Sequence, residues 1–367
     1  MIRNEQQASG MLRCALFGSG RIGRVHGANI ARHPDLELAW VADPFLDSAE
    51  ELAALHGARA TASPGEVFAD GTLDAVLICS PTDTHTQLIE AAAGHGLAVL
   101  CEKPIALDLA AASRCREALA NPASGVVPPV MVGFNRRFDP AFAGIRERTA
   151  DGEIGRLEQL TIISRDPAPA PEAYIRASGG IFRDMSIHDL DMARFFVPDI
   201  VEVTAHGSNI FSDYIRDAGD YDSAVITLRG RGGELITITN SRHSAYGYDQ
   251  RLEAFGSQGM LAAGNVSPTT VRKYTAEGAE QTAPYEPFFL ERYADAYRRE
   301  LDYFAAAVRS GTACSPGIDD GVAALVLAEA AVASASSGRT VTVDLGKFLA
   351  GGRAATATAA ITDEGAV

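Results

Sequence analysis

The stretch Leu12-Arg13-Cys14-Ala15-Leu16-Phe17-Gly18-Ser19-Gly20-Arg21-Ile22-Gly23 decides the fold of this chain. Its first six residues form a short apolar run of the kind that becomes a buried strand, and residues 22–33 follow with helical periodicity. Gly18 permits a tight turn, Gly20 lets the backbone approach a ligand, and Gly23 lets the helix pack against the sheet. This strand–turn–helix unit predicts the start of a doubly wound parallel sheet.

The next apolar run ends at Asp43, a carboxylate that indicates which dinucleotide the glycine-rich turn would bind. Asp43 lies twenty residues after Gly23, where a carboxylate accepts hydrogen bonds from both ribose hydroxyls of an adenosine. It also repels the extra phosphate of NADP, and residues 44–47 contain no Arg or Lys to counter it. The N-terminus of the helix offers N–H groups to the pyrophosphate. We therefore predict NAD as the cofactor, held by Gly18, Ser19, Gly20, Arg21, Ile22 and Asp43.

Two later segments also follow strands, at the sheet edge where such folds bind ligands. One is residues 79–85, and the other is Glu102-Lys103-Pro104, which places Lys103 where the nicotinamide is expected. His85 by itself is more typical of a surface residue at the start of a helix. The residues expected to contact the cofactor here are Ser80, Thr82, His85, Glu102 and Lys103.

The pattern of apolar segments divides the chain into two domains and a tail. In residues 11–136, apolar strands alternate with helical segments, which predicts an α/β, NAD-binding Rossmann domain with a parallel sheet covered on both faces. In residues 137–345 the strands lack regular crossover helices, which predicts an α+β domain with a large open, mostly antiparallel sheet. Two helices, near 290–310 and 319–336, are expected to close it. Residues 346–367 are rich in Gly, Ala and Thr and are predicted to be a flexible tail.

Composition narrows the class of protein. The formal net charge of −15 over 367 residues disfavours nucleic acid and anionic membrane surfaces as partners. No apolar run approaches the roughly 18 residues of a membrane span, and the polar residues 1–10 lack the apolar stretch of a secretory signal, so we expect a cytoplasmic protein. The five scattered cysteines contain no C-x-x-C pair and the eight histidines no zinc motif, so we expect no metal.

The Glu102-Lys103-Pro104 motif, placed after this fingerprint, resembles that of the Gfo/Idh/MocA oxidoreductase family. The resemblance extends from Leu12 to about Val343. Four further segments resemble its inositol 2-dehydrogenase branch, namely 133–139 (GFNRRFD), 164–167 (SRDP), 179–189 (GGIFRDMSIHD) and 246–251 (YGYDQR). In the family, the lysine of the first motif and a D-x-x-x-H pair are catalytic, which implies a catalytic set of Lys103, Asp184 and His188.

The chemistry of these three side chains agrees with that implication. Asp184 and His188 are four residues apart, so a helix would place them on one face. A histidine, which titrates near neutrality, suits the base that takes the hydroxyl proton, and the aspartate would orient the imidazole and stabilise its cation. Lys103 would stabilise the alkoxide. Without this context, such a pair is more often solvated and a lysine before proline is usually a surface residue.

The substrate pocket is less determined. We expect one of Arg136 and Arg137 to bind substrate and the other to form a structural ion pair, and the family pattern points to Arg136. Tyr248 offers a phenol to a polyol hydroxyl, although a core tyrosine is nearly as typical. Asp166 is a further expected ligand.

Three more residues bear on this pocket without settling it. Ser164 stands where inositol dehydrogenases can carry a histidine, which leaves the fine specificity open. Asp189 and Asp191 are expected to be capping or surface carboxylates, of which one can touch substrate.

These features together predict NAD-dependent oxidation of a secondary hydroxyl of a cyclic polyol, with myo-inositol giving 2-keto-myo-inositol (scyllo-inosose) as the first choice. Dehydrogenases of scyllo-inositol or of an aldose remain alternatives, as does a glycoside hydrolase that recycles its NAD. A non-catalytic NAD-binding regulator is a further alternative, which the presence of Lys103, Asp184 and His188 disfavours. Family members commonly pair their open sheets, so we expect a homotetramer.

Overall fold

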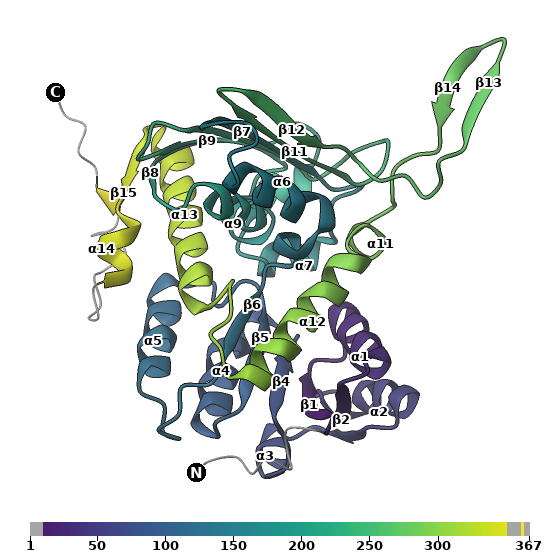
Figure 1. Cartoon of the computed structure of the whole chain (residues 1–367), viewed down its shortest axis with the longest axis vertical. Coiled ribbons are helices and arrows are strands. Elements are labelled where there is room, and N and C mark those ends of the chain that lie inside the picture. Colours follow the sequence, from purple (N-terminus) through teal and green to yellow (C-terminus); the bar gives the residue numbers. More distant parts are fainter. Residues whose placement is uncertain (1–9, 351–360, 363–367) are drawn as a thin grey trace. The chain divides into compact units, whose positions relative to one another are not determined.

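The computed structural model describes residues 10–350 and 361–362 (Figure 1). Contacts between Cα atoms divide these residues into two compact units. Unit 1 contains residues 10–135 and 297–322, and unit 2 contains residues 136–296, 323–350 and 361–362. We expected both closing helices in the second domain, but residues 297–322 group with unit 1.

Unit 1 is built on a six-stranded sheet in the order β3-β2-β1-β4-β5-β6, with every neighbouring pair parallel. Its strands are β1 (Leu12–Phe17), β2 (Leu36–Ala42), β3 (Arg59–Thr61), β4 (Ala75–Ile78), β5 (Ala98–Glu102) and β6 (Val130–Gly133). Its helices are α1 (Arg21–Arg32), α2 (Leu46–His56), α3 (Pro64–Phe68), η2 (Thr82–Thr84), α4 (His85–Gly94) and α5 (Leu109–Ala120). The central strands are buried on both faces, which confirms the predicted doubly wound sheet. The order reverses between β1 and β4, the switch point at which such sheets bind dinucleotides.

Helix α12 (Ala294–Ser310) crosses from unit 2 into unit 1. From residue 297 onward it belongs to unit 1, where Glu300 and Phe304 are fully buried. The chain after it closes the sheet edge, because the N–H of Val132 in β6 donates to the carbonyl of Pro316. The apolar residues of this segment therefore complete the core of unit 1.

Unit 2 is built on an eight-stranded sheet in the order β12-β11-β7-β10-β9-β8-β15-β16. All neighbouring pairs are antiparallel except β7 and β10, which confirms the mostly antiparallel sheet predicted from the sequence. The strands are β7 (Leu157–Arg165), β8 (Ile200–Ser208), β9 (Ser223–Gly230), β10 (Leu235–Ser241), β11 (Asp249–Gly256), β12 (Gly259–Ala263), β15 (Val341–Val343) and β16 (Ile361–Thr362). A separate hairpin joins β13 (Arg272–Thr275) to β14 (Gly278–Thr282).

Helices cover one face of this sheet, where Figure 1 shows α6 and α9 against the strands. Besides α12, the helices that begin in or reach unit 2 are η3 (Asn135–Phe138), α6 (Pro140–Ala150), α7 (Glu172–Ala177), α8 (Ile181–Asp184), α9 (Ser186–Phe196), α10 (Asp213–Asp217), α11 (Phe289–Arg292), α13 (Ile318–Ser337) and α14 (Leu345–Ala350). Residues of β9 alternate between buried and exposed, so its second face is open in a single chain. Exposed apolar side chains lie along the sheet at Val225, Leu235, Phe255 and Met260.

The predicted tail is only partly described. Helix α14 occupies its first residues, and β16 pairs with β15 farther along. Residues 351–360 and 363–367 lie outside the described residues, so the prediction of a flexible tail is not tested there.

Candidate active site

The glycine-rich turn of unit 1 has the geometry of a phosphate cradle. Gly18 has φ of +97°, and a Cβ atom there would lie 2.6 Å from the backbone carbonyl of Cys79. A Cβ at Gly23 would lie 2.0 Å from the carbonyl oxygen of Gly18, so the helix packs closely on the turn. A Cβ at Gly20 would meet nothing within 4 Å, and no side chain caps α1 at this residue. The open space and uncapped N–H groups fit the pyrophosphate of a dinucleotide.

Asp43 faces this turn from the end of β2. Its Oδ2 accepts hydrogen bonds from the N–H and the hydroxyl of Ser19, both at 2.8 Å, and its Oδ1 accepts from the N–H of Phe45 at 2.9 Å. Each carboxylate oxygen has a further lone pair, and the residue is only half-buried, so it can also accept from ribose hydroxyls. The side chain of Ser19 therefore supports the carboxylate, and these residues fit NAD.

His85 is buried, and both of its ring nitrogens contact backbone carbonyl oxygens. The side chain is 1% exposed, and its Nδ1 and Nε2 lie 2.8 and 2.9 Å from the carbonyl oxygens of Pro104 and Ser80. Burial lowers the pKa of its imidazole. The residue is therefore not at the surface, and it ties the loop after β4 to the loop after β5. Ser80 and Thr82 are half-buried at the loop it fixes.

Glu102 is 9% exposed and contacts a residue of α1. Its Oε1 lies 2.9 Å from Nε2 of His26 on α1, and a Cβ at Gly133 would lie 3.0 Å from its Oε2. The Glu102 carboxylate therefore ties the end of β5 to α1. Lys103, the next residue, is half-buried at the carboxyl end of β5, on the same sheet edge as the glycine-rich turn.

In unit 2, Asp184 and His188 lie on either side of one helical junction. Helix α8 ends at Asp184 and α9 begins at Ser186, with Met185 between them in the right-handed helical region. Both Asp184 and His188 are half-buried. The nearly continuous helical path agrees with the predicted four-residue spacing on one face.

The carboxylate of Asp184 is held by two residues that the sequence did not single out. The hydroxyl of Tyr174 on α7 donates to its Oδ1 at 2.7 Å, and Nη1 of Arg242 lies 3.5 Å from its Oδ2. Arg242 is 1% exposed and also donates from Nη2 to Oδ2 of Asp220 at 2.8 Å. These contacts join positions up to 58 residues apart, so no local pattern reveals them.

Arg136 and Arg137 are both buried in ion pairs. Arg136 pairs with Asp189 and donates from Nη1 to the hydroxyl of Ser164 at 2.8 Å. Arg137 forms a two-pronged pair with Asp191. Both arginines thus have the structural role that we expected of only one, and the two aspartates are buried counter-ions rather than capping or surface groups.

The network around Asp189 extends to the sheet. Asn240 on β10 donates from Nδ2 to Oδ2 of Asp189 at 2.7 Å and accepts from the hydroxyl of Ser186 at 2.6 Å. Ser164 on β7 donates to Oδ1 of Asp189 at 2.6 Å. This network fixes α9, which carries His188, against β7 and β10.

Tyr248 is part of the core of unit 2, the alternative that the sequence left open. It is 5% exposed and makes edge contacts with the rings of Phe288 and Tyr293. Burial raises the pKa of its phenol well above the usual value. Asp166 lies after β7, half-buried, with its N–H donating to the carbonyl of Ser241.

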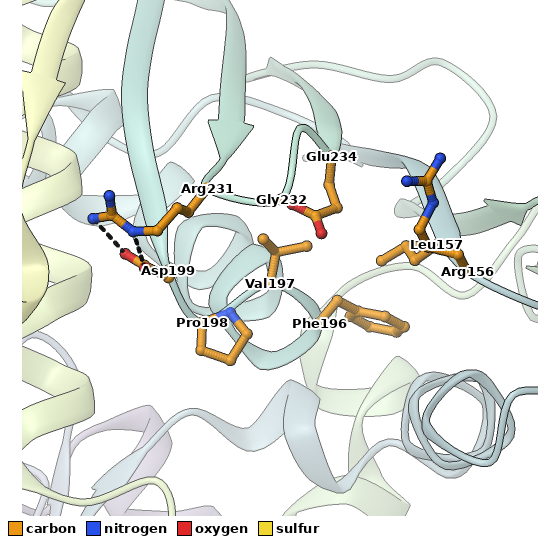
Figure 2. A pocket seen from close by; sticks show the side chains of 9 residues that line it. All are labelled: Arg156, Leu157, Phe196, Val197, Pro198, Asp199, Arg231, Gly232 and Glu234. Atoms are coloured by element: carbon orange, nitrogen blue, oxygen red, sulfur yellow. Dashed lines mark hydrogen bonds and ion pairs between the residues drawn. The ribbon is translucent and has the colours of Figure 1, made fainter.

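A shallow hollow of about 200 Å³ lies at another part of unit 2 (Figure 2). The residues that line it are Arg156, Leu157, Phe196, Val197, Pro198, Asp199, Arg231, Gly232 and Glu234. None of them is a predicted site residue, and Arg231 is paired with Asp199.

In the part of the chain that the structure describes, no cluster of His, Cys, Asp or Glu could hold a metal ion. No helix among the described residues has the length and apolar character to cross a membrane.

Comparisons with known proteins agree with this geometry. Residues 12–128 match the oxidoreductase family with an NAD-binding Rossmann fold, and residues 142–262 match the GFO/IDH/MocA C-terminal domain. The chain is 45% identical to the inositol 2-dehydrogenase of Rhizobium meliloti, covering 90% of this chain and 99% of that protein. It is 43% identical to the myo-inositol 2-dehydrogenase of Thermotoga maritima, covering 91% and 99%.

A solved structure extends the similarity to three dimensions. The myo-inositol dehydrogenase from Corynebacterium glutamicum superposes with a TM-score of 0.88 at 60% identity, covering 91% of this chain and 99% of that one. The predicted NAD cofactor and dehydrogenase class are thereby confirmed. The chain belongs to the Gfo/Idh/MocA family of NAD-binding oxidoreductases.

Proposed function

We propose that this protein oxidises a secondary hydroxyl of a cyclic polyol with NAD, and that its substrate is myo-inositol, giving 2-keto-myo-inositol. The observation that carries the proposal is the α8–α9 junction, where a carboxylate held by Tyr174 lies four residues before His188. The three relatives described above are all named as inositol dehydrogenases and share 43% to 60% identity with this chain.

Each catalytic residue has one task in this proposal. His188 accepts the proton of the reacting hydroxyl, and Asp184 stabilises the imidazolium that results. Lys103 donates a hydrogen bond to the reacting oxygen and stabilises its developing charge. When bound, NAD supplies the hydride acceptor. Removal of proton and hydride from one C–OH group gives a ketone, so atoms and charges balance.

We assign the residues that would bind cofactor and substrate within each unit separately. The turn from Gly18 to Ile22, including Arg21, would hold the pyrophosphate at the N-terminus of α1, and Asp43 would hold the ribose. Ser80 and Thr82 would lie along the cofactor. Of the predicted substrate ligands we retain Asp166 beside the catalytic three, whereas Arg136 and Tyr248 support the pocket from the buried side.

Absorbance of NADH tests this proposal directly. The purified protein is mixed with NAD and, in turn, with myo-inositol, scyllo-inositol, D-chiro-inositol, glucose and galactose. Strong NADH production with myo-inositol supports the proposal in full. Production confined to scyllo-inositol or an aldose would keep the mechanism and overturn the substrate.

Two further alternatives are distinguished by the same assay. A redox-cycling hydrolase would bind NAD but cleave a glycoside without net NADH, and a regulator would bind NAD without turnover. Either result would overturn the dehydrogenase mechanism, and a chromogenic glycoside separates the two.

We also propose that the protein is a homotetramer in the cytoplasm. The open face of the eight-stranded sheet, with Val225, Leu235, Phe255 and Met260 exposed, is the surface that would pair. The five cysteines are free thiols, which suits a reducing compartment. Sedimentation that shows a monomer at micromolar concentration would contradict the tetramer.

A further inference from the structure

Tyr174 joins an exposed helix to a predicted catalytic carboxylate. The side chain is 45% exposed, yet its hydroxyl donates to Oδ1 of Asp184 at 2.7 Å. Helix α7, which carries it, is anchored by Ile175, whose side chain is buried. The hydroxyl of Tyr214 on α10 donates to the carbonyl of Ala170 at 2.8 Å, just before α7. The helix is therefore fixed independently of the contact between Tyr174 and Asp184.

The other oxygen of Asp184 faces a buried cation. Arg242 lies between the carboxylates of Asp184 and Asp220, at 3.5 and 2.8 Å. Oδ1 of Asp220 accepts from the N–H of Ile181, the first residue of α8, at 2.8 Å. Asp220 and Arg242 thus hold both ends of the short helix that terminates in Asp184.

We propose that Tyr174 is a positioning residue of the reaction, which sets how strongly Asp184 stabilises a proton on His188. This inference rests on the proposed function, in which Asp184 stabilises the protonated imidazole. Tyr174 acts on one carboxylate oxygen, and Arg242 acts on the other.

The chemistry of the hydrogen bond gives the direction of the effect. A donor to a carboxylate spreads its negative charge and weakens its attraction for a neighbouring cation. Partial burial of the phenol and the charge of Asp184 raise the pKa of Tyr174 far above its usual value. The phenol therefore keeps its proton and remains a donor throughout the pH range of an assay.

Loss of this donor strengthens the pull of Asp184 on a proton at His188. The base must be neutral to accept the substrate proton, so the variant needs a higher pH to be active. The charged and titratable groups around this junction are Asp166 after β7, Tyr174 on α7, Arg183 on α8, His188 on α9, Asp220 after α10 and Arg242 after β10. Among these groups, Tyr174 is the one whose hydrogen-bonding atom can be removed by a substitution, tyrosine to phenylalanine, that changes neither the formal charge nor the size of the ring.

The test compares Tyr174→Phe with the matched control Tyr214→Phe. Both variants remove one hydroxyl from the α7–α10 region, but only the first hydroxyl contacts Asp184. The dependence of kcat/KM on pH is measured with NAD and the substrate found in the panel. In parallel, the imidazole of His188 is titrated by NMR in protein labelled at histidine, its resonance being assigned from the spectrum of His188→Gln.

We expect Tyr174→Phe to move the acid limb of kcat/KM to higher pH by about 0.5 unit, with plateau values within about twofold of the parent. The NMR midpoint of His188 should move in the same direction, and Tyr214→Phe should move neither. An unchanged or lowered midpoint in Tyr174→Phe, or an equal shift in Tyr214→Phe, overturns the inference. If the parent protein reduces no NAD, the proposed function fails, while the NMR midpoints still decide whether Tyr174 controls His188.

Discussion

Nε2 of His26 lies 2.9 Å from Oε1 of Glu102 in the core of unit 1, where the imidazole is fully buried. Glu300 on α12 is equally buried and acts electrostatically on the same carboxylate. Neither carboxylate oxygen of Glu300 has a hydrogen-bond partner among the described residues. Because a buried charge without a partner is costly, this cluster favours a neutral Glu300.

Replacing Glu300 by glutamine should therefore stabilise the protein increasingly as pH rises. Burial and the charge of Glu102 raise the pKa of Glu300 well above its usual value. Its contribution to stability is complete below the unfolded-state pKa, near 4.5, and is lost as pH rises toward the folded-state value. In that window the variant should gain on the parent by about 1.4 kcal/mol per pH unit.

Thermal unfolding at pH 6 and pH 8 measures this gain. The difference in Tm between Glu300→Gln and the parent should be larger at pH 8. Glu291→Gln, at an exposed position of α11, is the control and should show no such trend. A difference in Tm that does not depend on pH would mean that Glu300 is ionised in the folded protein.

Asp43→Ala should weaken NAD binding and reduce the preference for NAD over NADP. The variant loses the charged acceptor for the ribose hydroxyls, which corresponds to about a tenfold to hundredfold rise in KM for NAD. It also loses the charge that repels the extra phosphate of NADP. Glu50→Ala, which removes an exposed carboxylate from α2, is the control and should leave the KM for both cofactors unchanged. Unchanged kinetics with both cofactors in Asp43→Ala would remove this residue from the cofactor site.

His188→Ala should lower kcat/KM by about 10²- to 10⁴-fold while the Kd for NAD stays within about twofold. The catalytic base is lost, whereas the predicted cofactor ligands lie in unit 1. Steady-state kinetics and fluorescence titration with NADH measure the two quantities. His206→Ala, at an exposed position of β8, should change neither, and an active His188→Ala protein would exclude this residue as the base.

Asp189→Asn should destabilise the protein by about 3 to 5 kcal/mol, because it leaves Arg136 buried without its counter-ion. The matched control is Glu202→Gln, which breaks an exposed pair with Arg229 and should change the free energy of unfolding far less. Urea unfolding compares the two. If both substitutions had equally small effects on the free energy of unfolding, the hydrogen bonds of Ser164 and Asn240 would be sufficient to hold this buried network without the charge of Asp189.

Local patterns were sufficient to predict the framework of the fold and the cofactor turn. The requirement for glycine at Gly18 and Gly23 follows from close backbone contacts that the fingerprint encodes directly. The short elements β3 and α3 were not predicted, because a three-residue strand and a five-residue helix have too few residues to show a period. The eleven-residue helix α2 was also missed.

The side-chain contacts of the site were harder to predict. Tyr248 and Tyr246 stand two residues apart in one motif, yet the first is buried and the second is 43% exposed. Both precede β11, so the difference depends on the conformation of the loop before that strand. Arg136 and Asp189 are 53 residues apart in the chain, and Arg242 and Asp184 are 58 apart. Such pairs depend on tertiary packing, so a single sequence contains no signal for them.

The passage of α12 and α13 between the two units has a consequence for biogenesis. The chain leaves unit 1 after residue 135 and returns only at residue 297, with Pro316 still needed at the edge of β6. A ribosome therefore exposes the whole nucleotide-binding sheet long before it delivers the segment that completes that core. We expect a fragment ending near residue 136 to require chaperones or to aggregate, and a graft of this module onto another protein to succeed only if residues 297–322 travel with it.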